Sequence, residues 1–311
     1  MEQRQLGKSG LKVSLVGLGC NNFGGRVDVD GSQAVIRKAL DLGITLFDTA
    51  DTYGNRGGSE SILGNYLGSE RENIVLATKF GWEMGPGRGG ASRQYIYKAL
   101  AESLKRLKTD YIDLYQLHKP DPHTPLEETL STLNDLVRQG MVRYVGCSNL
   151  PAWQVVEAHW IAKQMGFEGF ISCQDEYSLL ARKVEAELLP AMQHLGLGLL
   201  PYFPLASGLL TGKYRRDGSM PEDARLARSQ QLAQSFMTEQ NLALVEKLES
   251  YSKSRGRTLL ELAFGWLASN PVVSSVIAGA TKPEQVVQNV KAVEWKMSDV
   301  ERNDVRSILD A

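Results

Sequence analysis

Eight short, apolar and mostly β-branched runs recur along this chain of 311 residues, and longer amphipathic segments separate them. The runs are residues 13–19, 45–50, 74–80, 111–118, 142–149, 170–177, 197–204 and 273–280. Such alternation is typical of repeated βα units, whose parallel strands are buried on both faces. Eight βα repeats close on themselves, so the sequence predicts an α/β fold of the (β/α)8, or TIM barrel, type.

Amphipathic segments after these runs predict the helices of the barrel. They cover residues 32–43, 58–67, 92–107, 126–139, 151–165, 183–194, 238–269 in two pieces around Gly256, and 283–291. A hairpin over residues 3–13 and a helix over residues 298–309 are expected at the two ends. No linker or change of composition divides the chain, so residues 1–311 are predicted to form one domain.

The glycine-rich stretch "GLGCNNFGG" after the first run suggests a different fold, the doubly wound dinucleotide-binding sheet. Its glycines, Gly17, Gly19 and Gly24, are spaced GxGxxxxG, whereas the dinucleotide fingerprint is GxGxxG. The next ~20 residues also lack a strand that ends in an acid able to hold a ribose. We therefore favour the barrel.

Charge and composition exclude several classes of partner. The formal net charge is −1, and no basic stripe or tail is present to bind a nucleic-acid backbone. No run approaches the ~18 apolar residues that span a membrane, and the first residues lack the apolar core of a signal peptide. We therefore expect a cytoplasmic protein with no membrane partner. Cys20, Cys147 and Cys173 form no CxxC pair, and we expect them to be buried in reducing surroundings.

Polar side chains stand at the carboxyl ends of the predicted strands, which in a barrel all meet at one rim. Asp48, Lys79 and His118 end the second, third and fourth strands, and Tyr53 lies five residues beyond Asp48. Singly, such residues are often turn formers, solvated or structural, but together they form a proton-transfer set. We expect Lys79 to lower the pKa of Tyr53, Asp48 to hold Lys79, and His118 to hydrogen-bond a substrate oxygen.

A metal site is the alternative at this rim, with Asp48, Asp51, His118 and His123 as ligands. The usual metal motif of barrels, two histidines flanking one residue, is absent. We therefore expect no metal.

Six segments carry a family resemblance: "FDTADTYG", "ATKF", "IDLYQLHKPD", "VGCSN", "PYFPLASGLLTGKY" and "GATKPEQVVQN". With them the chain resembles an aldo-keto reductase from about residue 4 to residue 295, and within that family a bacterial member of the branch with oxidoreductases and potassium-channel β subunits. The resemblance implies a (β/α)8 barrel that binds NADPH along its rim without a GxGxxG fingerprint. Matched residue by residue, the family's catalytic tetrad is Asp48, Tyr53, Lys79 and His118.

The resemblance also implies where the cofactor would lie. Ser148, Asn149 and Gln174 match residues that hydrogen-bond the nicotinamide carboxamide, and Tyr202 matches the aromatic residue that stacks on its ring. Amide side chains suit a carboxamide, which has one acceptor and two donors. The stretch "PLASGLLTGKY" resembles the loop that wraps the pyrophosphate, and the contacts implied there are Pro204, Leu205, Ser207, Gly208, Leu209 and Lys213.

The adenosine end is implied at the start of the last barrel helix. Thr281 is predicted to cap this helix with Glu284 completing a capping box, and a helix N-terminus is a ready phosphate site. The residues implied there are Gly279, Thr281, Lys282, Gln285 and Asn289. Better-known family members have Lys and Arg in place of Gly279 and Gln285, which leaves Lys282 as the nearby cation. We expect NADPH to be preferred, with NADH also possible.

The activity implied is NADPH-dependent reduction of an aldehyde or ketone to the alcohol, by hydride transfer from nicotinamide C4 while Tyr53 protonates the oxygen. Tyr53, His118 and Trp82 would contact the substrate, and the loop 81–92 and the segment 214–237 would line its pocket. The alternative is an NADPH-binding partner protein with little turnover, like the potassium-channel β subunits. A complete tetrad argues against that alternative.

Overall fold

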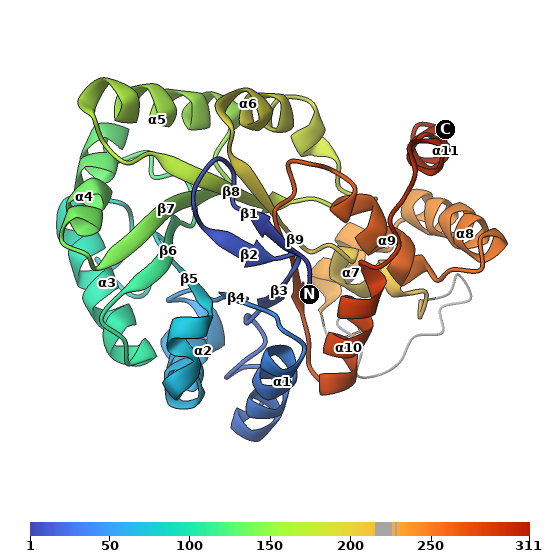
Figure 1. Ribbon diagram of the computed structural model, residues 1–311, viewed down its shortest axis with the longest axis horizontal. Coiled ribbons are helices and arrows are strands. Elements are labelled where there is room, and N and C mark those ends of the chain that lie inside the picture. The colour runs from blue at the N-terminus through green and yellow to red at the C-terminus, as the bar shows by residue number, and fades with distance from the viewer. Residues whose placement is uncertain (215–225, 228) are drawn as a thin grey trace.

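Eight parallel strands in the computed structural model form the barrel that the sequence predicts (Figure 1). The structure describes residues 1–214, 226, 227 and 229–311. In sheet order the strands are β10 (Val276–Gly279), β3 (Val16–Gly19), β4 (Leu46–Asp48), β5 (Val75–Phe80), β6 (Ile112–Leu117), β7 (Val142–Ser148), β8 (Phe170–Glu176) and β9 (Gly198–Tyr202). A parallel bridge between Leu199 and Val273 brings the two ends of the sheet together. The predicted fold class is thus confirmed.

Helices surround the strands (Figure 1). They are α1 (Val29–Asp41), α2 (Tyr53–Tyr66), α3 (Arg93–Leu107), α4 (Leu126–Arg138), α5 (Ala152–Met165), α6 (Leu188–Leu195), α7 (Gln230–Phe236), α8 (Glu239–Ser254), α9 (Leu259–Ala268), α10 (Pro283–Ala292) and α11 (Asp299–Leu309), with short 3-10 turns η1 (Gly68–Asn73), η2 (Lys183–Glu185) and η3 (Ala206–Thr211). Side-chain caps set several starts: Ser92, for example, accepts a hydrogen bond from the Tyr95 N–H at the start of α3. The sequence predicted these helices within a few residues, except for α7.

An antiparallel hairpin, β1 (Gln3–Gln5) and β2 (Lys12–Ser14), covers one end of the barrel (Figure 1). Its apolar side chains are buried in a cluster with those of the barrel interior. The strand predicted over residues 13–19 is wrong as one element, because the hairpin ends at Ser14 and β3 begins only at Val16. The Ser14 hydroxyl donates to the Val16 carbonyl at 2.7 Å and so stabilises the break between the two strands.

Helix α2 begins earlier than the predicted range of 58–67, and its first turn is unusual. The element starts at Tyr53, and Gly54–Gly57 have left-handed backbone angles before the right-handed helix continues. A Cβ on Gly54 would lie 2.3 Å from the Phe23 carbonyl oxygen, so only glycine fits there. The two non-glycine residues of this turn each cost about 1–2 kcal/mol. Backbone strain is therefore stored directly after Tyr53.

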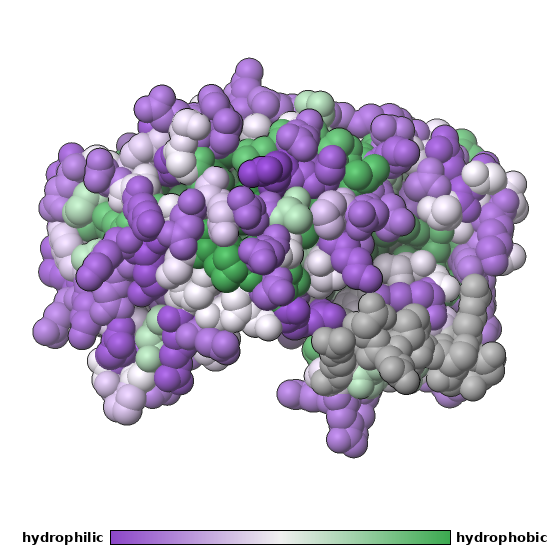
Figure 2. Space-filling view, turned by 90° about the horizontal axis from the view of Figure 1, so that it is seen from below, coloured by the Kyte–Doolittle hydropathy of each residue, from purple (hydrophilic) through white to green (hydrophobic). Residues whose placement is uncertain are grey.

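The carboxyl ends of the strands form the rim at the other end of the barrel from the hairpin. The hairpin bonds to the start of β9, where Lys8 N–H donates to the Gly196 carbonyl at 2.9 Å. Figure 2 shows a largely hydrophilic outer surface that is hollowed along its lower edge. The polar strand ends named above lie at this rim.

The helices and the cysteines of the described residues bear on where the protein can reside. None of their helices is long and apolar enough to cross a membrane. All three cysteines are buried, as predicted, and they are free thiols. Their neighbours are mostly apolar core side chains.

Candidate active site

Lys79 joins three polar groups at the rim. It is fully buried near the end of β5, and its Nζ donates to three oxygens. They are Oδ2 of Asp48 at 2.7 Å, the carbonyl oxygen of Thr49 at 2.8 Å and Oη of Tyr53 at 3.3 Å. Burial opposes the ammonium charge, but Asp48 and Tyr53 outweigh it and raise the pKa of Lys79. Lys79 therefore stays charged and links the carboxylate to the phenol.

Two glutamines hold the other oxygen of Asp48. Nε2 of Gln174 donates to Oδ1 at 2.8 Å, and Nε2 of Gln116 donates to it at 3.2 Å. Sequence reasoning missed Gln116, although it stands two residues before His118 in an extended run and so faces the same way. Gln174, which was predicted to contact a cofactor, also fixes the carboxylate that pairs with Lys79.

The pKa of the Tyr53 phenol is raised, whereas the sequence led us to expect a lowered value. Burial has the largest effect and favours the neutral phenol, and the nearby charge of Lys79 offsets it only in part. Lys79 thus acts on the Tyr53 pKa in the expected direction, but the net shift is upward, because sequence order does not show how deeply a side chain is buried. Tyr53 therefore keeps its proton through the neutral pH range, as a proton donor must.

His118 faces the ring of Tyr53. The two ring centroids are 5.8 Å apart, and the rings are nearly perpendicular. Burial, followed by the charges of Lys79 and Lys119, lowers the pKa of His118 to about 2. Its Nδ1 is buried and has no hydrogen-bond partner among the described residues. The imidazole is therefore neutral at neutral pH and can donate one hydrogen bond from a ring N–H.

The four residues that the sequence offered as metal ligands do not form a metal site. Asp48 is paired with Lys79 instead. His123 is exposed. In the described part of the chain, no group of three or more His, Cys, Asp or Glu is placed to hold a metal ion.

A cavity of about 1020 Å³ extends from Tyr53 and His118 to α10. Most of the residues predicted to contact a cofactor line it: Ser148, Asn149, Gln174, Tyr202, Pro204, Leu205, Ser207, Gly208, Lys213, Gly279, Thr281, Gln285 and Asn289. Leu209 does not, because its side chain is fully buried in a hydrophobic cluster. Lys282, which is exposed at the start of α10, does not line it either.

The predicted substrate loops contribute little to this cavity. Trp82 lines it, but the rest of the loop 81–92 does not. The described residues of the segment 214–237 do not line it either, and residues 215–225 and 228 lie outside the described part of the chain.

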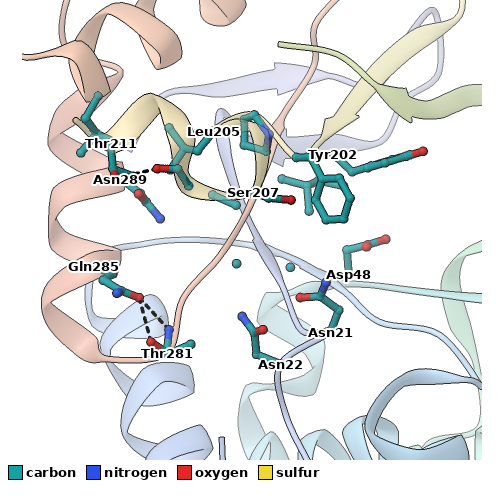
Figure 3. A pocket seen from close by; sticks show the side chains of 18 of the residues that line it. Asn21, Asn22, Asp48, Tyr202, Leu205, Ser207, Thr211, Thr281, Gln285 and Asn289 are labelled. Carbon is teal, nitrogen blue, oxygen red and sulfur yellow. Dashed lines mark hydrogen bonds between the residues drawn. The ribbon is translucent and has the colours of Figure 1, made fainter. Parts of the chain in front are cut away.

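Three walls surround the cavity in Figure 3. Asn21 and Asn22, after β3, face the Leu205–Ser207 stretch across it, and Gln285 and Asn289 of α10 form a third side. Sequence reasoning missed these lining residues: Gly19, Asn21, Asn22, Arg26, Phe203, Thr211, Thr258, Leu260, Glu261, Ile277, Ala278, Gln288, Lys291 and Ala292. Two of those on α10, Gln288 and Ala292, stand three and seven positions after Gln285 and so share its helix face. This helical spacing could have been used to predict these lining residues from the sequence.

The start of α10 differs from the predicted capping box. Lys282 is the N-cap residue, and it makes no side-chain capping bond. Oε1 of Gln285 accepts from the Thr281 N–H at 2.8 Å and from the Thr281 hydroxyl at 3.3 Å (Figure 3). The predicted pairing of Thr281 with Glu284 was wrong, because the helix begins one residue later and the longer glutamine side chain reaches back.

The sequence profile of the family described as "Aldo/keto reductase family" matches residues 15–310, which contain the whole barrel and its rim. The chain belongs to the aldo/keto reductase family. It is accordingly an NAD(P)H-dependent oxidoreductase, and relatives named as oxidoreductases support this.

Relatives from plants and bacteria resemble this aldo/keto reductase over 94% of its length. A rice (Oryza sativa subsp. japonica) protein named probable voltage-gated potassium channel subunit beta is 42% identical over 302 residues, which cover 92% of that protein. The uncharacterized oxidoreductase YrpG of Bacillus subtilis is 39% identical over 306 residues and 91% of its length. The L-glyceraldehyde 3-phosphate reductase of Escherichia coli K12 is 36% identical over 306 residues and 88% of its length.

The side chains along the cavity fit the nicotinamide cofactor that the aldo/keto reductase family uses. Asn149 Nδ2 donates to the Ser148 hydroxyl at 2.9 Å, while Asn149 Oδ1 accepts from the Tyr202 hydroxyl at 2.8 Å. This cluster therefore offers amide and hydroxyl groups at one end of the cavity. Further along, Oγ of Ser207 is buried with no partner among the described residues. Left-handed angles at Ser207 and Gly208 turn this segment at the cavity wall, where a phosphate would find a hydroxyl donor.

Asp51 is a buried acid two residues before Tyr53. Its side chain is almost completely enclosed, and neither carboxylate oxygen has a partner among the described residues. Burial and, to a lesser extent, the charge of Glu60 raise its pKa from 3.8 to about 7. Its backbone N–H donates to the Lys79 carbonyl at 3.2 Å, which fixes Asp51 behind the site.

Replacing Asp51 by asparagine should remove a pH-dependent loss of stability. The folded chain holds this proton more tightly than the unfolded chain, so stability falls as the pH rises from 3.8 to about 7. Between pH 5.5 and 8 the wild type should lose about 2 kcal/mol of unfolding free energy relative to Asp51→Asn. Burial raises the pKa of Asp175 to about 8. Asp175 titrates in both proteins, so its contribution cancels in the difference between their unfolding free energies. Urea denaturation at both pH values measures the difference, and parallel pH dependences would contradict it.

Proposed function

We propose that this chain reduces an aldehyde or ketone with NADPH, using Tyr53 as the proton donor. The observation that carries the proposal is the position of the Lys79 ammonium, which contacts both Asp48 and the Tyr53 hydroxyl. A buried cation beside a phenol stabilises the phenolate that remains once the proton has left. Tyr53 can therefore supply the proton that the carbonyl oxygen needs when a carbonyl is reduced to an alcohol.

Each member of the tetrad has a distinct role in this proposal. Tyr53 gives its proton to the carbonyl oxygen, and Lys79 stabilises the resulting phenolate. Asp48, held by its two glutamines, keeps Lys79 charged and in place. His118, which is neutral, donates a hydrogen bond that orients the carbonyl oxygen. When bound, the nicotinamide supplies the hydride for the carbonyl carbon.

The family's pattern assigns the cavity wall to the cofactor in this proposal. Ser148, Asn149 and Gln174 would hold the carboxamide, and Tyr202 would cover the ring. The turn around Ser207 would take the pyrophosphate, and the start of α10 would take the adenosine end.

An NADPH-binding partner protein is the second candidate. The rice relative at 42% identity, and an Arabidopsis thaliana relative at 41%, are named as potassium channel β subunits. Turnover distinguishes the two candidates, because a partner protein binds NADPH with little carbonyl reduction.

The direct test is oxidation of NADPH and of NADH, in parallel, with a panel of aldehydes and ketones. L-Glyceraldehyde 3-phosphate belongs in the panel, because two E. coli relatives are named for its reduction. Robust turnover of several members supports the reductase. Tight NADPH binding without turnover of any member would favour the partner protein.

Preference for NADPH should depend on a cation near the 2′-phosphate. We expect Lys282→Ala to weaken NADPH binding by about ten- to hundredfold, the worth of one charge-assisted hydrogen bond, and to leave NADH binding nearly unchanged. Arg26→Ala is the matched comparison, because Arg26 lines the cavity and Lys282 does not. Fluorescence titration of both cofactors against each variant measures this. A selective NADPH loss in Arg26→Ala alone would move the phosphate contact to Arg26, and equal losses for both cofactors would contradict either assignment.

A further inference from the structure

Trp82 and Lys119 come from different loops and meet beside His118. Lys119 Nζ lies 4.3 Å from the centroid of the Trp82 ring. The Trp82 ring also meets the His118 ring edge-on, with centroids 6.2 Å apart. Trp82 lines the cavity and is 45% exposed, and Lys119 is half-buried next to it. An aromatic ring that lines the tetrad end of the cavity therefore carries an ammonium group on one face, and Lys119 itself is not among the lining residues.

Asp121 joins the two loops that carry these side chains. Its Oδ2 accepts from the Ala91 N–H of the Trp82 loop at 2.7 Å and from the Thr124 hydroxyl at 2.8 Å. A Cβ on Gly90 would lie 2.8 Å from the same oxygen, so glycine permits this close contact. Gly90 N–H in turn donates to the Gly81 carbonyl at 3.1 Å, which closes the Trp82 loop on itself. The contact between Trp82 and Lys119 is therefore held in place by the backbone of both loops.

The charge of Lys119 is not paired with a carboxylate in the described part of the chain. Glu83 and Asp121 are the acids next to it in the two loops. Glu83 is exposed and makes no ion pair with Lys119 among the described contacts. Asp121 is occupied by donors from its own loop and the Trp82 loop. His118 is neutral and adds no charge. A positive charge that no described carboxylate pairs therefore lies against the Trp82 ring, beside this end of the cavity.

We propose that Trp82 and Lys119 form a subsite for an anionic group on the substrate, so that short aldehydes or ketones carrying a phosphate or a carboxylate are preferred. The proposal rests on the proposed function, because it takes the carbonyl oxygen to lie between Tyr53 and His118. The Trp82 face covers the carbon chain, and the Lys119 ammonium pairs with the anion.

Two matched substrate pairs test the subsite with NADPH at saturation. The pairs are glyceraldehyde 3-phosphate with glyceraldehyde, and succinic semialdehyde with butanal. They are assayed with wild type, Lys119→Met, Lys119→Arg and the control Lys105→Met, which changes an exposed lysine near the end of α3. The first pair reports on phosphate and the second on carboxylate.

The wild type should prefer the charged member of at least one pair by about tenfold or more in kcat/KM. Lys119→Met should reduce this ratio about tenfold, mainly through KM, and Lys119→Arg should restore most of it. The wild-type ratio should also fall as salt is raised, because a partly exposed ion pair is screened. Lys105→Met should match the wild type.

Three results would overturn the subsite. They are no preference for either anion in the wild type, equal losses for charged and neutral substrates in Lys119→Met, and the same loss in Lys105→Met. If none of the four carbonyls were reduced, the proposed function would fail instead. Calorimetric titration of glycerol 3-phosphate into the wild type and Lys119→Met would then decide the subsite alone: weaker binding to the variant supports it, and equal binding contradicts it.

Discussion

Tyr53→Phe should lower carbonyl reduction by about 10²-fold or more and leave cofactor affinity close to that of the wild type. Phenylalanine keeps the ring that packs near His118 and Lys79 and removes only the hydroxyl that accepts from Lys79 Nζ at 3.3 Å. The loss should appear in kcat rather than in KM, because the hydroxyl acts when the proton is transferred.

Steady-state kinetics and an NADPH fluorescence titration on the same preparation separate the two effects. Turnover by Tyr53→Phe within about threefold of the wild type would show that Tyr53 is not the proton donor. Phenylalanine also keeps most of the packing of tyrosine, so a parallel unfolding curve shows whether the loss arises from chemistry or from folding.

Lys79→Met should abolish carbonyl reduction and also destabilise the protein. Methionine fills most of the space of the lysine stem, but the Asp48 carboxylate is then left buried without its cation. Removing one partner of a buried ion pair typically costs about 3–5 kcal/mol. The bonds from Gln116 and Gln174 to Asp48 stay in place, which puts the expected cost at the lower end of that range.

The double variant Asp48→Asn with Lys79→Met is the matched control. It removes both charges, so it should recover much of the unfolding free energy while activity stays absent. Urea denaturation and NADPH oxidation on all three proteins distinguish these effects. A Lys79→Met protein that is active and as stable as the wild type would show that something other than Lys79 supports Tyr53.

The barrel could be read from the sequence because its signals are local. Each strand is a short apolar run, and each helix has its own periodicity and caps, so eight repeats are visible without tertiary contacts. Asp48, Lys79 and His118 were also within reach, since strand ends in a barrel meet at one rim. The division at Ser14 was not, because hairpin and barrel strand are both apolar and extended, and only pairing partners separate them.

Only the tertiary structure shows how deeply each side chain is buried and which side chains from distant parts of the chain are in contact. Burial reversed the expected direction of the Tyr53 pKa, since desolvation outweighs one neighbouring cation. Gln116 and Gln174 reach Asp48 from two other strands, and no spacing rule in the sequence links them. Lys119 meets Trp82 in the same way, because the two loops are joined only once the barrel has closed. The sequence by itself determined the order of the strands and which polar residues follow them at the rim, whereas the folded chain determined the electrostatic surroundings of those residues.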